Sequence, residues 1–253
     1  MIEFDTALQA TIPPNVTVCI TSCARLDLLS KTLDTFRRYN RGGKFLISED
    51  SCDPVVVEKL RQSYPGMTIL WGSERLGIMR SIDRLYLNVE TEIIFHLEDD
   101  WEFSGAVDWN AALALLNARP DIVNICVRAI SEMKEKYLNR SEALSTAGAS
   151  FRIMHLDAHP EYYSWSPNPG FLRRTTYDQF APFSRVNPDQ MSGLMKKAQL
   201  RQAFLLPGVA HHIGYGRNVT DPTMPPRPKS KPEKWRRAIR KKLYYAGLRR
   251  NPF

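Results

Sequence analysis

The 253-residue sequence has few cysteines and no long apolar run. The cysteines are Cys19, Cys23, Cys52 and Cys126, and they form no dense framework like that of small secreted domains, which favours a reducing compartment. No stretch of 18 uninterrupted apolar residues is present, and residues 1–15 lack the basic and apolar regions of an export signal. We therefore expect a cytoplasmic chain with no membrane span of its own.

Several common catalytic motifs are also missing. The sequence has no G-x-S-x-G nucleophile elbow and no G-x-x-x-x-G-K-[ST] phosphate loop. Gly214-Tyr215-Gly216 lacks the third glycine and the preceding strand of a dinucleotide-binding fingerprint. The cysteines have no paired C-x-x-C spacing, which argues against a zinc site. A serine hydrolase, a P-loop enzyme and a Rossmann dehydrogenase all lose support.

The charge of the chain is unevenly distributed. Apolar residues make up 43% of the sequence, enough for a substantial core, and the net charge is +8. Residues 227–253 hold eleven Lys and Arg against Glu233 alone, a net charge of +10, so residues 1–226 carry a net charge of −2. The sequence therefore predicts a nearly neutral folded body with a basic appendage.

From Val16 onward, short β-branched runs alternate with longer amphipathic segments, which predicts an α/β fold with a mostly parallel central sheet flanked by helices. Strands buried on both faces are predicted at residues 16–21, 44–48, 67–71, 92–97 and 122–127. Helices are predicted at residues 26–39, 54–64, 77–89, 107–118 and 188–200. The alternation weakens over residues 131–187, where we expect excursions around a site.

The C-terminal segment is different in kind. Residues 221–232 contain five prolines and predict an extended linker after an ordered body that ends near Thr220. A basic amphipathic helical tail is predicted beyond it, with one apolar face made of Trp235, Ile239, Leu243 and Ala246. Such a helix is typical of docking on an anionic membrane surface. A nucleic-acid-binding arm and a solvated tail are the alternatives.

Three consecutive acids, Glu98-Asp99-Asp100, stand where the apolar strand at residues 92–97 ends. Parallel sheets bind ligands outside the carboxyl ends of their strands. In extended backbone Glu98 and Asp100 point to one side, and carboxylates that close repel unless a cation or bound protons relieve them. Oxygen ligands suit Mg²⁺ or Mn²⁺. The alternative is an acidic, solvated turn.

Two further clusters follow other predicted strands. Asp50, in the run SEDSCD, is a candidate for holding a base or ribose, whereas Asp53-Pro54 is predicted to cap the next helix. Gly77 and Arg80, in the run RLGIMR, stand at the start of a helix, which is a favourable place for phosphate oxygens. Solvated arginines are the alternative there.

The order CITSCAR, SEDSCD, RLGIMRSIDR, FHLEDDWEF resembles the nucleotide-sugar-binding half of a GT-A fold glycosyltransferase of the family-two type. LEDDW also resembles the Glu-Asp-Asp form of the Asp-x-Asp metal motif. The resemblance extends over residues 15–220 and implies a GT-A catalytic domain over residues 1–220, with a nucleotide-sugar-binding half at residues 15–103 and an acceptor-side half at residues 104–220. The chain departs from the family in CITSC and in having Glu49 for the usual first Asp.

The resemblance implies a role for each motif residue. Asp100 would ligate a divalent metal, Mn²⁺ or Mg²⁺, and His212, in a segment similar to the family's late His-x-Gly, is a candidate further ligand. Because neighbouring residues of a strand point to opposite faces, at most one of His211 and His212 should reach the metal. The other implied donor contacts are Thr21 and Arg25 beside the nucleotide, Asp50 on the base, Gly77 and Arg80 near the diphosphate, and Glu98 and Asp99 facing the ribose and sugar.

The second half of the chain supplies weaker matches. The run WSPNPGFLRR from Trp165 resembles the acceptor-side segment beneath the donor sugar. Asn187-Pro188-Asp189-Gln190 opens the next predicted helix, where this fold presents its catalytic carboxylate, so Asp189 is the implied general base. Ordinary capping chemistry of that helix is the alternative for Asp189.

The resemblance therefore implies a metal-dependent glycosyltransferase that moves a sugar, with inversion, from a nucleotide-diphosphate donor such as a UDP-sugar to an acceptor hydroxyl. With its basic tail, such an enzyme would work at the inner face of the membrane, on a glycan or lipid-linked acceptor in polysaccharide biosynthesis. The alternatives are a nucleic-acid-binding protein, or a glycosyltransferase that acts on DNA and holds it with the tail. The identities of the sugar, nucleotide and acceptor depend on loops within residues 128–190.

Overall fold

The computed structural model describes residues 9–160, 163–224, 228 and 230–249. The chain divides into two compact units, Met1–Val219 and Thr220–Phe253. Within the described residues, no helix has both the length and the apolar character needed to cross a membrane. The candidate site lies in the first unit and the basic helix in the second.

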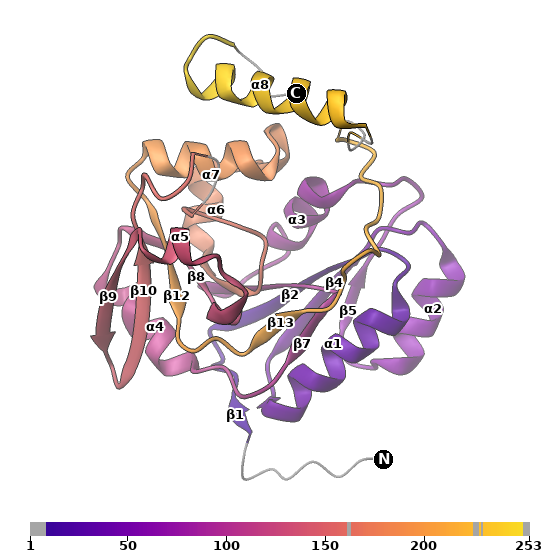
Figure 1. Ribbon diagram of the computed structural model, residues 1–253. Coiled ribbons are helices and arrows are strands. Elements are labelled where there is room, and N and C mark those ends of the chain that lie inside the picture. Colours follow the sequence, from indigo (N-terminus) through magenta and orange to yellow (C-terminus); the bar gives the residue numbers. More distant parts are fainter. Residues whose placement is uncertain (1–8, 161–162, 225–227, 229, 250–253) are drawn as a thin grey trace. The chain divides into compact units, whose positions relative to one another are not determined.

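The first unit is built on a nine-stranded sheet in the order β5-β4-β2-β6-β11-β8-β12-β10-β9 (Figure 1). Strands β10 and β11 run against all the others, so most strands are parallel in direction, as predicted. In sheet order the bounds are Thr68–Leu70, Lys44–Glu49, Val16–Ser22, Ile93–Glu98, Gly170–Arg173, Ile122–Cys126, Arg201–Leu205, Ala149–Met154 and Ser141–Thr146.

Two small sheets complete the strands. β1 (Ala10–Thr11) pairs in parallel with β3 (Asn40–Arg41). β7 (Trp101–Phe103) pairs antiparallel with β13 (Ala210–His212). The second pairing is important for the site, because it brings the end of the first unit back to the segment that follows the acidic cluster.

The helices lie in two layers, one on each face of the large sheet (Figure 1). One core joins the sheet to α1 (Leu26–Tyr39), α2 (Pro54–Ser63) and α4 (Trp109–Ala118). The other joins it to α3 (Ile78–Tyr86), α6 (Arg174–Phe180) and α7 (Pro188–Lys197). The short α5 (Glu135–Leu138) and 3-10 turns at Ile130–Glu132 and Phe183–Arg185 lie in the connections. The predicted α/β class with flanking helices is confirmed.

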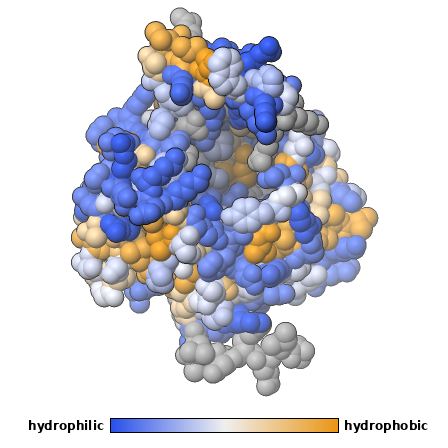
Figure 2. Space-filling model, viewed as in Figure 1, coloured by the Kyte–Doolittle hydropathy of each residue, from blue (hydrophilic) through white to orange (hydrophobic). Residues whose placement is uncertain are grey.

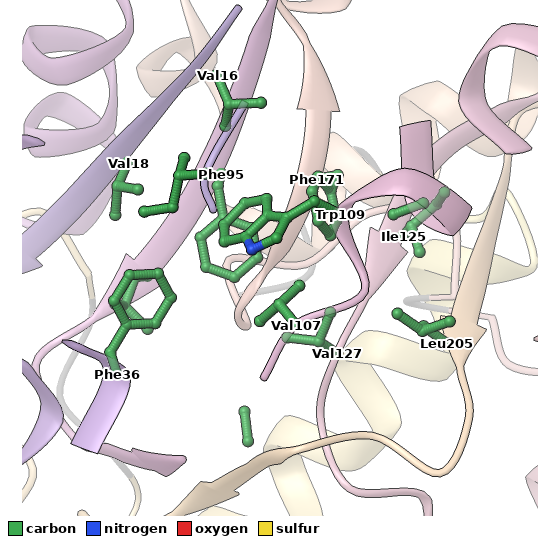
Figure 3. Packing of buried hydrophobic residues seen from close by; sticks show 14 of the residues in the cluster. Val16, Val18, Phe36, Phe95, Val107, Trp109, Ile125, Val127, Phe171 and Leu205 are labelled. Carbon is green, nitrogen blue, oxygen red and sulfur yellow. The ribbon is translucent and has the colours of Figure 1, made fainter. Parts of the chain in front are cut away.

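Strand alternation separates the two cores. In β2, Val16, Val18 and Ile20 belong to the first core, whereas Cys19 belongs to the second. Around the first core, the ring of Phe95 lies 5.0 Å from both Trp109 and Phe171, centroid to centroid (Figure 3). Each such pair adds about 0.5–1.5 kcal/mol beyond the area it buries.

All five predicted strands and all five predicted helices are present, with ends that differ by a few residues. One detail is wrong: β5 is not buried on both faces, because it is the edge strand and its residues are exposed or half-buried. Strands β9 to β13 lie in and beyond the region where only excursions were expected.

The second unit contains α8 (Lys231–Tyr245), so the predicted helix of the basic tail is present. The side chain of Ser230 accepts a hydrogen bond from the backbone N–H of Glu233, and the Glu233 side chain accepts one from the backbone N–H of Ser230. This reciprocal capping box fixes the start of the helix.

A buried histidine gives the first unit a predictable response to acid. His96, in β6, has both ring nitrogens buried without a hydrogen-bond partner among the described residues, and burial lowers its pKa from 6.5 to about 3. Between these two values the unfolded chain binds the proton and the folded chain does not. Stability should therefore fall by about 1.4 kcal/mol for each pH unit below about 6.5.

The variant His96→Leu isolates this effect, because leucine has a similar volume and no titrating group. In urea unfolding at a series of pH values from 7 down to about 4, we expect the free energies of unfolding of wild type and variant to diverge progressively, with the variant more stable in acid. Parallel pH profiles for the two proteins would contradict the assignment of a neutral, buried His96.

Candidate functional site

The carboxyl ends of β2, β4 and β6 meet at one edge of the sheet. Thr21 of β2 lies in register with Ser48 of β4 on one side and with Glu98 of β6 on the other. Glu98 ends β6, and the segments that follow the three strands carry Arg25, Asp50 and the pair Asp99-Asp100, so residues from three separate sequence motifs lie at this edge. This is the edge where parallel sheets bind ligands.

Arg25 joins the two acids that follow Glu98. It contacts Asp99 through Nη2, and its Nε lies 3.2 Å from Asp99 Oδ2. Its Nη1 donates to Asp100 Oδ2 at 2.8 Å. The backbone N–H of Cys23 also donates to Asp99 Oδ2, at 3.3 Å. The predicted nucleotide-side residue Arg25 is therefore the protein's own cationic partner of the acidic cluster.

The acidic cluster is deeply placed and incompletely neutralised. Burial raises the pKa of Asp99 to about 6, although Arg25 opposes the shift. Burial, with repulsion from Asp100, also raises the pKa of Glu98, whose Oε2 accepts a hydrogen bond from Trp101 Nε1 at 3.3 Å. Burial lowers the pKa of Arg25, but the two aspartates outweigh it and the net pKa is raised. One guanidinium among three carboxyl groups leaves room for a second positive charge.

His212 reaches this cluster from the other end of the unit. Its Nε2 lies 3.5 Å from Asp100 Oδ2, because β13 pairs with β7 directly after the acids. His211 points elsewhere: its Nε2 lies 3.1 Å from Ser104 Oγ. His212 is thus the histidine that lies beside Asp100, and its role as a metal ligand stays a prediction.

Backbone contacts fix the segment after His212 against Asp100. The N–H of Ile213 donates to the carbonyl oxygen of Asp100 at 2.9 Å. Gly214 lies so close that a Cβ atom there would stand 2.2 Å from Asp100 Oδ2. The lack of a side chain at Gly214 therefore allows the Asp100 carboxylate to lie where it does.

The sequence interpretation missed the residues that hold His212 in place. Glu132 Oε1 accepts the backbone N–H of His212 at 3.1 Å, and Glu132 Oε2 accepts Arg128 Nε at 2.8 Å. The Arg128 guanidinium lies 5.5 Å from the centre of the Trp101 ring, and the His212 ring lies 5.2 Å from the same ring. No local motif marks Glu132, since the residue that it positions, His212, lies 80 residues away.

The exit of β4 is organised by Asp50 and Glu49. Asp50 accepts the backbone N–H groups of Leu76 at 2.7 Å and Gly77 at 3.0 Å. Asp50 and Gly77, both predicted to bind the nucleotide-sugar, therefore bind each other. Glu49 Oε1 accepts the N–H groups of Ala24 and Ser51, each at 2.9 Å. Glu49 Oε2 is buried and has no hydrogen-bond partner among the described residues.

The residues predicted to bind the nucleotide-sugar on this side of the site have other contacts within the protein. The amide of Gly77 faces a carboxylate in this structure, and Gly77 caps α3 with a φ of 77°. Arg80 lies exposed on α3, whereas Arg84 of the same helix donates to Ser48 Oγ and to the Glu49 carbonyl oxygen. Asp53 caps α2 by accepting the N–H of Val55 at 2.8 Å, as predicted. The roles of Asp50, Gly77 and Arg80 toward a nucleotide stay predictions.

Asp189 lies half-buried in the first turn of α7. The capping of that helix belongs to Asn187, whose side chain accepts the N–H of Gln190 at 2.9 Å. Farther along α7, Ser192 Oγ accepts the N–H groups of Ser164 and Trp165 and so joins the helix to the predicted acceptor-side segment. The role of Asp189 as general base stays a prediction.

The Asp100 carboxylate and the His212 imidazole suit a divalent transition metal better than magnesium, because an imidazole nitrogen favours transition metals whereas Mg²⁺ prefers oxygen ligands. Within the part of the chain that the structure describes, no group of three or more His, Cys, Asp or Glu side chains is arranged to hold a metal ion. The roles of Asp100 and His212 as metal ligands stay predictions. A cavity of about 620 Å³ lies beside β1, and neither Asp100 nor His212 lines it.

No protein-family model matches the sequence, and no curated protein is similar to it in sequence. Solved structures do match the fold. The crystal structure of S. aureus TarS 1-349 is 12% identical, with a TM-score of 0.50 over 77% of this chain and 59% of that one. The mannosyltransferase PcManGT from Pyrobaculum calidifontis, in complex with GDP-Man and Mn²⁺, is 13% identical, with a TM-score of 0.50 over 98% of this chain and 68% of that one.

GalNAc-T7, crystallised with UDP, GalNAc and Mn²⁺, has a TM-score of 0.55 at 11% identity over 91% of this chain. The present chain spans 50% of GalNAc-T7 and 59% of the TarS structure. At these identities the likeness shows the fold alone. The first unit therefore has the GT-A fold.

Proposed function

We propose that this protein is a glycosyltransferase that transfers a sugar from a nucleotide-diphosphate donor, a UDP-sugar, to an acceptor hydroxyl with inversion. The observation that carries the proposal is the meeting of Asp100, Arg25 and His212 on the ligand-binding edge of a GT-A fold. Matching structures of this fold contain Mn²⁺ with GDP-Man or with UDP and GalNAc, which supports both the donor class and the metal.

Asp100 and His212 would hold the divalent ion, and Mn²⁺ or Mg²⁺ would supply Lewis-acid stabilisation of the diphosphate leaving group. The protein's own residues complete the site. Asp99, held by Arg25 and by the Cys23 amide, fixes the direction of the loop that carries Asp100. Arg25 contacts the Asp100 carboxylate, so its guanidinium could bind the same diphosphate as the metal.

The other predicted residues would contact the nucleotide-sugar or the acceptor. Asp50, Gly77 and Arg80 would lie on the nucleotide side, together with Thr21, while Glu98 would face the ribose or sugar. Asp189 would take the proton from the acceptor hydroxyl as its oxygen attacks the anomeric carbon. The acceptor would be a glycan or lipid-linked saccharide, so the protein would work in polysaccharide synthesis at the cytoplasmic face of a membrane.

A screen of nucleotide-sugars by thermal unfolding tests the donor assignment. With Mn²⁺ present, the correct donor at about 100 times its Kd should stabilise the protein by about 2.7 kcal/mol, whereas other nucleotide-sugars should shift the melting temperature little. Addition of excess EDTA should remove the stabilisation. If no UDP- or GDP-sugar shifts the transition with Mn²⁺ present, the proposal fails.

A further inference from the structure

Helix α8 presents an apolar strip to solvent. Trp235, Ile239 and Leu243 follow one another at intervals of four residues, so they share one face of the helix. Their residues are 69%, 36% and 39% exposed. Helix α1 has the same kind of strip, but its Leu29, Leu33 and Phe36 are fully buried in the core of the first unit.

The described residues of the second unit offer no other helix or strand to pack against this strip. Among its described residues, α8 is the one helix, and the segment before it is rich in proline. A large apolar side chain left in water, such as Trp235, gives up roughly 1.5–3 kcal/mol that burial would supply. The exposed strip therefore indicates a surface that binds a membrane or another molecule.

Cations border the strip on both sides. Arg236 and Arg240 each follow a strip residue by one position and lie on one flank, whereas Lys231 and Lys242 lie on the other flank. All four are exposed. Figure 2 shows hydrophilic and hydrophobic atoms side by side on α8, at the top of the view. A helix with an apolar face between rows of Lys and Arg fits the boundary between lipid headgroups and acyl chains.

We infer that α8 docks this protein on a membrane surface rich in anionic lipid, with Trp235, Ile239 and Leu243 inserted among the acyl chains and the flanking cations on the headgroups. Charge complementarity selects an anionic partner, and the apolar strip selects a lipid phase over a nucleic acid. Phosphates alone would attract the cations, but they offer no place for Ile239 and Leu243. The inference is independent of the chemistry at Asp100.

Vesicle co-sedimentation of the full chain tests this inference. We expect binding to vesicles of phosphatidylglycerol mixed with phosphatidylcholine, little binding to pure phosphatidylcholine, and loss of binding as the salt concentration rises toward about 1 M. The double variant Arg236→Gln, Arg240→Gln removes two cations and should weaken binding about 30-fold.

A second double variant, Trp235→Ser with Ile239→Ser, should weaken vesicle binding at least ~10-fold while leaving the charge unchanged. Leu87→Ser is the matched control, because it removes an apolar residue that is 66% exposed in the first unit, and it should bind vesicles like the wild type. Unfolding curves verify that each variant keeps its first unit folded.

Two kinds of outcome would overturn membrane docking. One is vesicle binding that does not depend on the cations or the apolar strip of α8, seen either as equal binding to anionic and neutral vesicles or as binding that both double variants retain. The other is tight, salt-dependent binding to duplex DNA by the wild type and by the Trp235→Ser, Ile239→Ser variant, with no binding to vesicles. The second outcome would assign the cations of α8 to a nucleic-acid-binding arm instead.

Discussion

Replacement of Asp100 by asparagine should lower the rate of sugar transfer by about 10³-fold or more, because the proposed metal site loses its anionic ligand. The amide keeps the size of the side chain, so the packing against Gly214 is retained. The ion pair between Arg25 and Asp99 also remains. We therefore expect the free energy of unfolding to change by no more than about 1–2 kcal/mol.

The measurement is a transfer assay with the donor found in the screen, repeated over a range of Mn²⁺ concentrations, alongside urea unfolding of the same preparations. Asp53→Asn is the matched control, since asparagine caps a helix about as well as aspartate and the Asp53 side chain binds the first turn of α2. Full activity of Asp100→Asn, or of the wild type in excess chelator, would refute the metal-dependent mechanism.

The parts of the fold that the sequence predicted are those with local causes. Strand β2 was predicted from its run of β-branched residues and helix α1 from its three-to-four spacing of apolar residues, and each pattern lies within a short stretch of chain. The acidic cluster was found for the same reason, since it directly follows an apolar strand. Because the cluster lies at the carboxyl end of a parallel strand, it indicated the edge of the sheet where ligands bind.

The parts that were missed depend on distant partners. Strands β9 and β10 have half-polar sequences and become strands through pairing with each other and with β12. Antiparallel β11 is only four residues long and is inserted between β6 and β8, so no periodic pattern develops. Tertiary pairing decides such segments more than their own composition does.

The same distinction applies to the candidate site. The sequence predicted Arg25, Asp100 and His212 separately, but gave no indication that Arg25 would bind both aspartates. Glu132 was missed altogether, because its role is to hold the backbone of His212, 80 residues away. Contacts of this kind arise from the pairing of β7 with β13, which no local sequence pattern predicts.

Gly214→Ala should lower the transfer rate about 100-fold with no loss of the fold. The added Cβ would stand 2.2 Å from Oδ2, 2.7 Å from Cγ and 2.8 Å from Cβ of Asp100, so the whole Asp100 side chain has to move by about an ångström together with the backbone beside it. A displacement of that size at a reacting centre costs about two orders of magnitude in rate. The backbone of Gly214 is not in the left-handed region, so the effect comes from this contact and not from strain.

Gly193→Ala provides the contrast. A Cβ at Gly193 meets nothing within 4 Å, and the residue lies inside α7, so alanine should raise the free energy of unfolding by about 0.5–1 kcal/mol and leave transfer unchanged. The assay compares both variants at saturating Mn²⁺ and at concentrations near half-saturation. Wild-type rates for Gly214→Ala at both concentrations would mean that the position of the Asp100 carboxylate is irrelevant to the reaction, and the proposed site would have to be placed elsewhere on the sheet edge.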